Sequence, residues 1–150
     1  MEYFRFLRQH VGHEPILTAG TILVIFNEKK EILMQLLTDY NSCWFPGGSM
    51  ELCENFEQVA QRELKEETNL IIDELKLIDI MSGKETFRIY PNGDQVYDIT
   101  AIYEVTKYHG DLKVNDDESK ELKWFALDNI PNNLSQIMKN YWEKIKKHYV

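Results

Sequence analysis

The sequence has little cysteine, no long apolar run and no excess of positive charge. Only two of its 150 residues are cysteines, Cys43 and Cys53, and they form neither a CxxC pair nor a cluster with histidines. A disulfide framework and a structural zinc site are therefore disfavoured. The longest apolar stretch, ILVIF (22–26), is far too short to cross a bilayer, and MEYFRFLRQHVGHEP lacks the apolar segment of a secretory signal. We expect a cytoplasmic protein without a membrane partner.

Basic residues are in the minority. The chain has 17 lysines and arginines against 25 aspartates and glutamates, a formal net charge of −8. Because the phosphates of duplex nucleic acid repel an acidic surface, we expect no duplex partner. A local cationic pocket for a small phosphate ligand is compatible with this charge.

Glycine and proline are also scarce, at seven and four residues, and no linker, internal repeat or low-complexity tract divides the chain. A hydrophobic content of 43% supports a packed core. We therefore expect a single domain over residues 1–150. A second copy of the chain, contacting the first through an amino-terminal helix, is a partner that the sequence leaves open.

The hydrophobic pattern alternates between short β-rich runs and amphipathic segments, which predicts an α/β (α+β) fold. Helices are expected over 2–10, 55–70 and 133–150. Strands are expected over 17–26, 31–38, 75–83, 84–90, 95–105 and 120–127. The polar NEKK (27–30) would join the first two strands into a hairpin, and PNGD (91–94) would connect 84–90 to 95–105.

The helix expected over 55–70 places acids where apolar side chains belong. At 3.6 residues per turn, Glu63 and Glu67 fall within its apolar stripe and Glu66 falls at the edge. The stripe itself consists of Phe56, Val59, Ala60 and Leu64. Carboxylates turned towards a core are costly unless they are paired or bind metal, and converging carboxylate oxygens suit Mg²⁺ or Mn²⁺. The pattern favours a metal site over a solvated helix face.

The loop WFPGG (44–48) precedes this helix, and its two glycines allow backbone groups to approach a metal or a phosphate closely. Taken alone, WFPGG is typical of an ordinary tight turn. Its spacing is more specific: Gly48, five residues, Glu54, seven residues, then Arg62-Glu63-Leu64-Lys65-Glu66-Glu67-Thr68-Asn69-Leu70.

This segment, Gly48 to Leu70, resembles the Nudix box, Gly-x5-Glu-x7-Arg-Glu-U-x-Glu-Glu-x-Gly-U, in which U is aliphatic. The single departure is Asn69, which stands at the final glycine of the pattern. After glycine, asparagine is the residue most often found in the left-handed conformation that ends a helix. The resemblance therefore extends to the helix stop.

The resemblance to the Nudix (MutT-like) hydrolases implies an α/β/α sandwich around a mixed β-sheet. It also implies hydrolysis of a nucleoside diphosphate linked to another moiety X, such as ADP-ribose, a nucleotide sugar or a modified nucleoside triphosphate. By motif position, Glu63, Glu66, Glu67 and the carbonyl of Gly47 would hold Mg²⁺ or Mn²⁺, and Glu63 or a loop carboxylate would help to deprotonate water. Arg62 and Glu54 would hold this arrangement in place, although an ordinary surface pair explains those two residues equally well.

Two further candidates lie outside the box. The family often takes another carboxylate from a late loop, and in VNDDESKEL (114–122) we select Glu118 as the metal-site candidate. Arg88 is the candidate substrate contact, because Lys84, Thr86, Arg88 and Tyr90 would alternate on one face of a strand. That face is either a phosphate-binding wall or simply the solvated side of the strand.

Two other functions stay open. One is a Nudix-like sensor or regulatory module that binds a nucleotide without turnover, although a sensor need not retain costly carboxylates. The other is isomerisation of a prenyl diphosphate, for which Cys43 is the candidate catalytic thiol. Hydrolysis of a small-molecule nucleotide is the function that the sequence favours.

Overall fold

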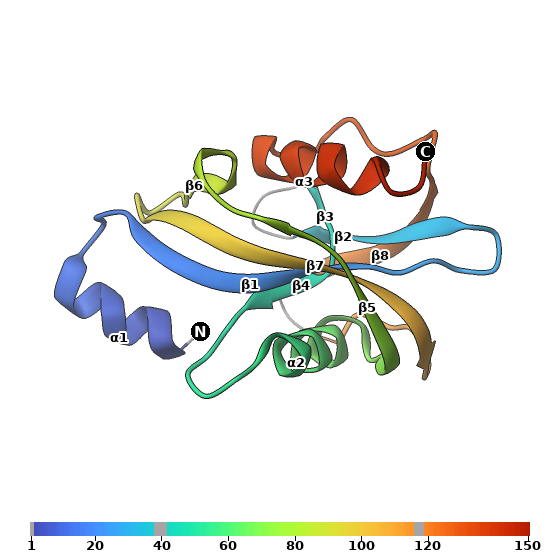
Figure 1. Ribbon diagram of the computed structural model, residues 1–150, viewed down its shortest axis with the longest axis horizontal. Helices are drawn as coiled ribbons and strands as arrows, with labels where there is room; N and C mark the ends of the chain where they lie inside the picture. The colour runs from blue at the N-terminus through green and yellow to red at the C-terminus, as the bar shows by residue number, and fades with distance from the viewer. Residues whose placement is uncertain (1, 38–41, 116–118) are drawn as a thin grey trace.

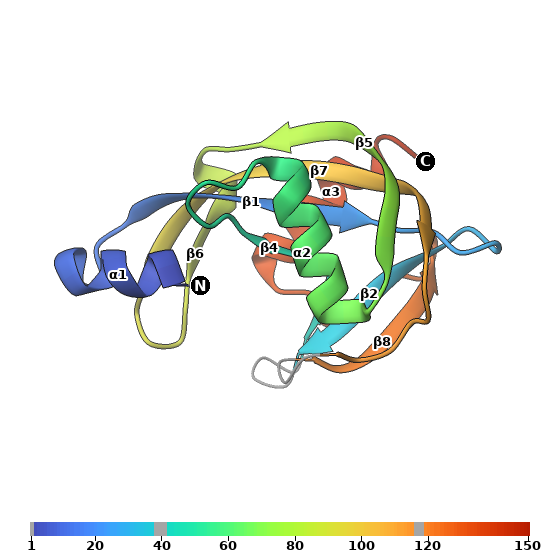
Figure 2. The same cartoon turned by 90° about the horizontal axis from the view of Figure 1, so that it is seen from below.

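The computed structural model describes residues 2–37, 42–115 and 119–150, and its sheets and helices form a layered arrangement (Figures 1 and 2). The helical elements are α1 (Glu2–Val11), α2 (Phe56–Thr68), η1 (Lys84–Thr86) and α3 (Gln136–Lys146). The strands are β1 (Ile16–Val24), β2 (Glu31–Leu37), β3 (Cys43–Trp44), β4 (Gly47–Ser49), β5 (Ile71–Met81), β6 (Phe87–Ile89), β7 (Gln95–His109) and β8 (Ser119–Ala126).

The strands form two sheets. The larger has the order β4-β1-β7-β5, with β6 also pairing with β7; β1 and β7 are parallel and the other pairs are antiparallel. The smaller sheet, β3-β2-β8, is antiparallel throughout. In Figure 1, α2 and α3 lie on opposite sides of the larger sheet. The predicted α/β/α sandwich around a mixed sheet is confirmed.

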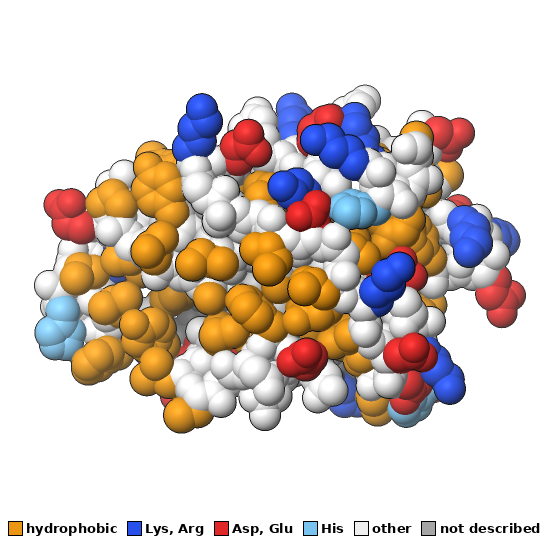
Figure 3. Space-filling model, viewed as in Figure 1, with side chains coloured by type: hydrophobic (Ala, Val, Ile, Leu, Met, Phe, Trp, Pro, Cys, Tyr) orange, Lys and Arg blue, Asp and Glu red, His pale blue; other side chains and the backbone are white. Residues whose placement is uncertain are grey.

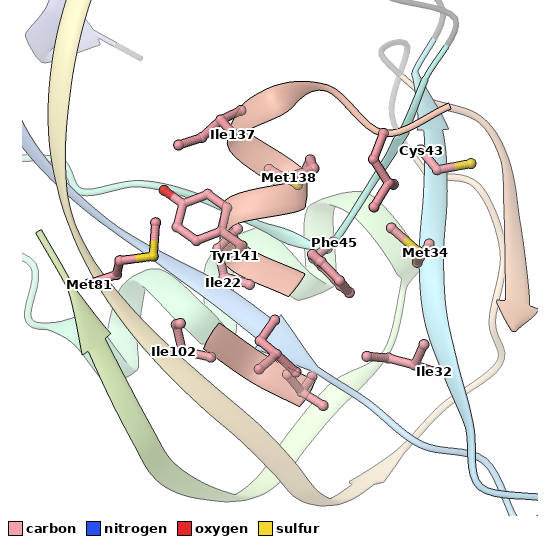
Figure 4. Packing of buried hydrophobic residues seen from close by; sticks show 13 residues of the cluster. Ile22, Ile32, Met34, Cys43, Phe45, Met81, Ile102, Ile137, Met138 and Tyr141 are labelled. Carbon is pink, nitrogen blue, oxygen red and sulfur yellow. The ribbon is translucent and has the colours of Figure 1, made fainter. Parts of the chain in front are cut away.

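Successive residues of β1 explain the layering, because side chains of a strand alternate between its faces. Leu23 is fully buried in a cluster that includes Leu64 of α2. Its neighbours Ile22 and Val24 belong to a second cluster that includes Met138 of α3 (Figure 4). The continuous apolar run thus supplies both cores, one on each side of the sheet.

The predicted hairpin between the first two strands is wrong beyond its turn. The turn forms, since the Asn27 side chain accepts hydrogen bonds from the backbone N–H groups of Lys29 and Glu31. The strands then separate into different sheets, and an isolated bridge between Phe26 and Ile32 lies near the turn. The reason is that β4 and β7 occupy both edges of β1, which leaves no edge for β2.

The predicted strand over 84–90 is shorter than expected. Lys84–Thr86 is a 3₁₀ turn, and the strand begins at Phe87. The Thr86 hydroxyl donates to the carbonyl of Gly83 and accepts from the backbone N–H of Asp98. These local bonds stabilise the turn, so Lys84 does not share the strand face of Arg88.

Part of the α2-side surface of the larger sheet is exposed. Leu17, Ile80, Ile89 and Ile99 on this side are exposed, and Figure 3 shows hydrophobic side chains gathered over the strands. The neighbouring helix α1 has no buried residue. Association of two copies through α1 stays a prediction. None of the helices in the described segments combines the length and apolarity needed to cross a membrane.

Candidate active site

A cleft of about 980 Å³ opens beside β4 and α2. The sequence-predicted residues that line it are Gly47, Arg62, Glu63, Glu66, Glu67 and Arg88. Glu54 is not among the lining residues and reaches the site through Arg62. Glu118 lies outside the described residues. The geometry therefore brings together residues from the helix, the glycine loop and a strand some twenty residues further along the chain.

Both ends of α2 are capped, which fixes the position of its acids. At the start, the Asn55 side chain accepts from the backbone N–H of Gln58, while the Gln58 side chain accepts from the backbone N–H of Asn55. At the end, Asn69 has a φ of 66° and its N–H donates to the Lys65 carbonyl. The prediction that Asn69 ends the helix in the left-handed conformation is confirmed.

Glu67 is turned inward, as the helix periodicity predicts. It is 6% exposed, and its Oε1 accepts from the backbone N–H of Gly47 at 2.9 Å. Its Oε2 accepts from the side-chain amide of Gln35 in β2. A buried carboxylate is tolerated here because polar donors from both sheets surround it.

Glu63 lies over a position that lacks a side chain. Its Oε1 accepts from Nη1 of Arg62 at 2.8 Å, and its side chain is 15% exposed. A Cβ on Gly48 would lie 2.2 Å from the Glu63 carboxyl carbon, so the glycine makes the space that the carboxylate fills. Glu66 is the most accessible of the three acids, with a side chain 57% exposed and one oxygen 3.7 Å from Arg62.

Arg62 and Glu54 form a two-pronged ion pair. Nε and Nη2 of Arg62 donate to the two Glu54 oxygens at 2.7 and 2.8 Å, and Nη2 also donates to the Ser49 carbonyl at 2.9 Å. Hydrogen bonding to Arg62 lowers the pKa of Glu54 despite its partial burial, and the same bond raises the pKa of Arg62. The guanidinium thus joins the loop, Glu54 and Glu63, which is more than a surface pair does.

The donor set suits a hard divalent cation in its chemistry, because the carboxylates of Glu63, Glu66 and Glu67 line the same cleft. Across residues 2–37, 42–115 and 119–150, however, no three Asp, Glu, His or Cys side chains are gathered closely enough to form a ready-made cation site. Arg62 holds one oxygen of Glu63, and Gly47 and Gln35 hold Glu67. The third acid, Glu66, is the most exposed of the set.

The structure also reveals site residues that the sequence reasoning missed. Trp44, Asp98 and Tyr141 line the cleft together with Arg88 and with Tyr90, which the sequence had placed on the same strand face as Arg88. An aspartate inside the largely apolar run QVYDITAIYEV was the available signal, because an acid between buried strand positions requires polar partners. The contribution of Trp44 and Tyr141 depends on tertiary packing and has no local signal.

Cys43 lies in the core and is not among the residues that line the cleft. Its burial raises the pKa of the thiol, which disfavours the reactive thiolate. The observations therefore give no support to a catalytic role for this cysteine in an isomerase reaction.

Comparison with known proteins shows the family of the chain. The model of the NUDIX domain matches residues 17–145. The ADP-ribose pyrophosphatase of Methanocaldococcus jannaschii is 30% identical over 123 residues, which are 79% of this chain and 69% of that protein.

Two solved structures share the fold. The MutT NUDIX hydrolase of Burkholderia pseudomallei has a TM-score of 0.73 and 22% identity, covering 87% of this chain and 98% of that one. The NUDIX domain of Shewanella oneidensis NrtR, complexed with ADP ribose, has a TM-score of 0.67 and 16% identity, covering 99% and 97%. From the matching domain, the pyrophosphatase relative and the residues of the box, the chain belongs to the NUDIX domain family and is a Nudix hydrolase.

Proposed function

We propose that this hydrolase cleaves the pyrophosphate bond of a nucleoside diphosphate linked to a moiety X, and that it uses Mg²⁺ or Mn²⁺. The observation that carries the proposal is the placement of Glu63, Glu66 and Glu67 along one cleft, with Glu67 buried. The similarity to an ADP-ribose pyrophosphatase makes ADP-ribose the first substrate to test. Nucleotide sugars and modified nucleoside triphosphates complete the proposed substrate class.

The three glutamates and the carbonyl of Gly47 would hold the divalent cation. When bound, the cation supplies positive charge that offsets the phosphoryl oxygens and lowers the pKa of the attacking water. Glu63, or Glu118 from the late loop, would accept the proton of that water. Arg62 orients Glu63 through its 2.8 Å bond, and Glu54 in turn holds Arg62.

The acids of the site differ in how firmly the protein holds them. Glu67 is fixed by Gly47 and Gln35, whereas the exposed Glu66 can change its orientation as substrate and cation bind. A positioned carboxylate beside an adjustable one suits phosphoryl transfer, in which most of the catalysis is positioning and charge stabilisation. Arg88 is the proposed substrate contact on the same cleft.

The test is a panel of ADP-ribose, nucleotide sugars and modified nucleoside triphosphates with Mg²⁺ or Mn²⁺, followed by analysis of the phosphorus-containing products. Glu66→Gln should lower kcat by about 100-fold or more, since a charge that stabilises the transition state is lost. Because the Glu66 side chain is exposed, thermal stability should hardly change.

Glu57→Gln is the matched control. Glu57 is an exposed glutamate of the same helix and does not line the cleft, so its replacement should leave turnover unchanged. Absence of product from every compound would overturn the proposal. Tight binding of ADP-ribose without any product would instead indicate the sensor function.

A further inference from the structure

The α3 side of the cleft carries a second set of polar groups that the glutamate chemistry does not use. We call it the α3-side subsite, and it consists of Trp44, Arg88, Tyr90, Asp98 and Tyr141. We propose that the α3-side subsite binds the X moiety and selects an X that is a sugar, whose hydroxyls donate to Asp98 and whose oxygens accept from Arg88. The inference rests on the proposed hydrolysis, and it names the substrate class within it.

Asp98 is held in a fixed orientation by one donor on the neighbouring strand β1 and one on its own strand, β7. Its Oδ1 accepts from the Thr18 hydroxyl of β1 and its Oδ2 accepts from the Thr100 hydroxyl. The Thr100 hydroxyl also bonds to the hydroxyl of Tyr141 at 2.8 Å. In the described parts of the chain, no lysine, arginine or histidine forms an ion pair with Asp98. A carboxylate has about four lone-pair sites, so acceptor capacity remains for two ligand hydroxyls.

Arg88 is held by aromatic rings instead of carboxylates. The guanidinium carbon lies 5.4 Å from the centroid of the Trp44 ring and 4.8 Å from that of Tyr90. Such cation–π contacts occupy none of the N–H groups in conventional hydrogen bonds, so these groups can still donate to a ligand. Among the residues that the structure describes, its buried Nε finds no hydrogen-bond partner, which is costly unless a ligand supplies an acceptor.

Arg88 and Asp98 face the same space without pairing. Arg88 lies opposite Val96 in the β6–β7 ladder, and Asp98 follows two residues later on the same face. Such a diagonal separates the Cβ atoms by about 7–8 Å. Burial raises the pKa of Tyr141 to about 12. The negative charge of Asp98 contributes to this rise, and the positive charge of Arg88 opposes it. Tyr141 therefore stays protonated at neutral pH.

This combination fits a sugar better than the other parts of a nucleotide. A phosphate would meet the negative charge of Asp98, with which no cation of the described residues forms a direct ion pair. A nucleobase stacks on aromatic faces, and Arg88 takes one face each of Trp44 and Tyr90, which reduces the aromatic surface left for stacking. A sugar offers hydroxyl donors for the carboxylate and oxygen acceptors for the guanidinium, and it carries no charge.

The test compares two ligands of equal phosphate charge, ADP-ribose and the β-methyl ester of ADP, by calorimetry with all divalent metal chelated. The wild-type protein should bind ADP-ribose about 10- to 100-fold more tightly, the range expected for hydrogen bonds to a charged group. Asp98→Asn should abolish most of this preference while the affinity for the methyl ester changes less than about 2-fold. Glu85→Gln, an exposed acid outside the cleft lining, should behave as wild type.

Equal affinity of the wild-type protein for the two ligands would overturn the inference, and so would an equal loss of both affinities in Asp98→Asn. If Asp98→Asn fails to fold in a thermal melt, Arg88→Gln carries the same comparison, with Lys84→Gln as its control. The binding ratio requires no turnover. A protein that binds ADP-ribose preferentially but yields no product contradicts only the proposed hydrolysis, and one that hydrolyses the panel without a sugar preference contradicts only the subsite.

Discussion

The Glu63 carboxylate occupies the place where a side chain on Gly48 would begin, with only 2.2 Å between the carboxyl carbon and an ideal Cβ. Gly48→Ala should therefore push the Glu63 carboxylate aside without moving the backbone, because the obstructed atoms are the far end of a flexible side chain. We expect kcat to fall by about 100-fold, since misplaced catalytic groups lose that much, while the melting temperature changes little. Steady-state kinetics and a thermal melt on one protein sample measure both.

The neighbouring Gly47 is the comparison for this prediction. A Cβ there would lie 2.1 Å from the Thr21 carbonyl oxygen, and Gly47 has a φ of 148°. Gly47→Ala should destabilise the fold by about 2–4 kcal/mol, because the obstruction is backbone and cannot rotate away. The explanation is wrong if Gly48→Ala retains full activity, or if it unfolds as readily as Gly47→Ala.

The ion pair of Arg62 and Glu54 predicts a pH dependence of stability. The pKa of Glu54 lies below 4.5 in the folded protein, mainly because of the hydrogen bond from Arg62. Its contribution to the unfolding free energy is therefore complete above pH 4.5 and is lost as the pH falls through the lowered folded value. Glu54→Gln should be less stable than wild type at pH 6, and the difference should shrink on acidification. Urea unfolding at several pH values tests this, and a difference that is the same at pH 3 and pH 6 would count against it.

Variants at Asn69, the residue that ends α2, should differ in stability in a definite order. It occupies the left-handed region, its side chain accepts from Lys65 and it donates to the Asp111 carbonyl at 2.9 Å. Asn69→Ala should cost about 1 kcal/mol or more, because alanine is strained in that conformation and makes neither bond. Asn69→Gly should cost less, since glycine adopts the conformation without strain. Denaturant midpoints rank the three proteins, and a glycine variant less stable than the alanine variant would contradict this account.

The two cysteines should differ sharply in reactivity. Cys53 is exposed, whereas Cys43 is buried in the α3-side core and burial raises the pKa of its thiol. In the native protein a thiol reagent should therefore modify one cysteine rapidly and the second only after unfolding. Mass spectrometry of the labelled peptides identifies the modified residue. Rapid labelling of Cys43 in the native state would contradict its placement in the core.

Local patterns in the sequence predict the helix α2 well. Its period places Glu63 and Glu67 on the buried side, and Asn69 marks its end, because these properties depend on neighbours within a few turns. The 23-residue spacing of the box also indicates that Arg62 and Glu54 are partners. The spacing does not distinguish an ordinary surface ion pair from a structural one, and the hydrogen bonds in the structure make that distinction.

Properties that depend on distant partners were not predictable in the same way. The hairpin prediction failed because β7, whose residues lie 80 positions beyond their partners in β1, occupies an edge of β1. The Gln35 amide reaches Glu67 across 32 positions, and no local pattern marks that glutamine as a partner. Asp98 belongs to the site because the β6–β7 register sets it diagonally from Arg88, and a register depends on pairing of whole strands.

Glu67 joins three parts of the molecule: it belongs to α2, and it accepts from Gly47 in β4 and from Gln35 in β2. Within the described segments, Glu66 is exposed and approaches Arg62 of the same helix at 3.7 Å. If a descendant of this protein ceased to need catalysis, Glu66 would be replaced at little cost, whereas replacing Glu67 would deprive donors in both sheets of their acceptor. In proteins descended from this one that have lost activity, we therefore expect the exposed Glu66 to be substituted early. The buried Glu67 should be retained long after activity has gone.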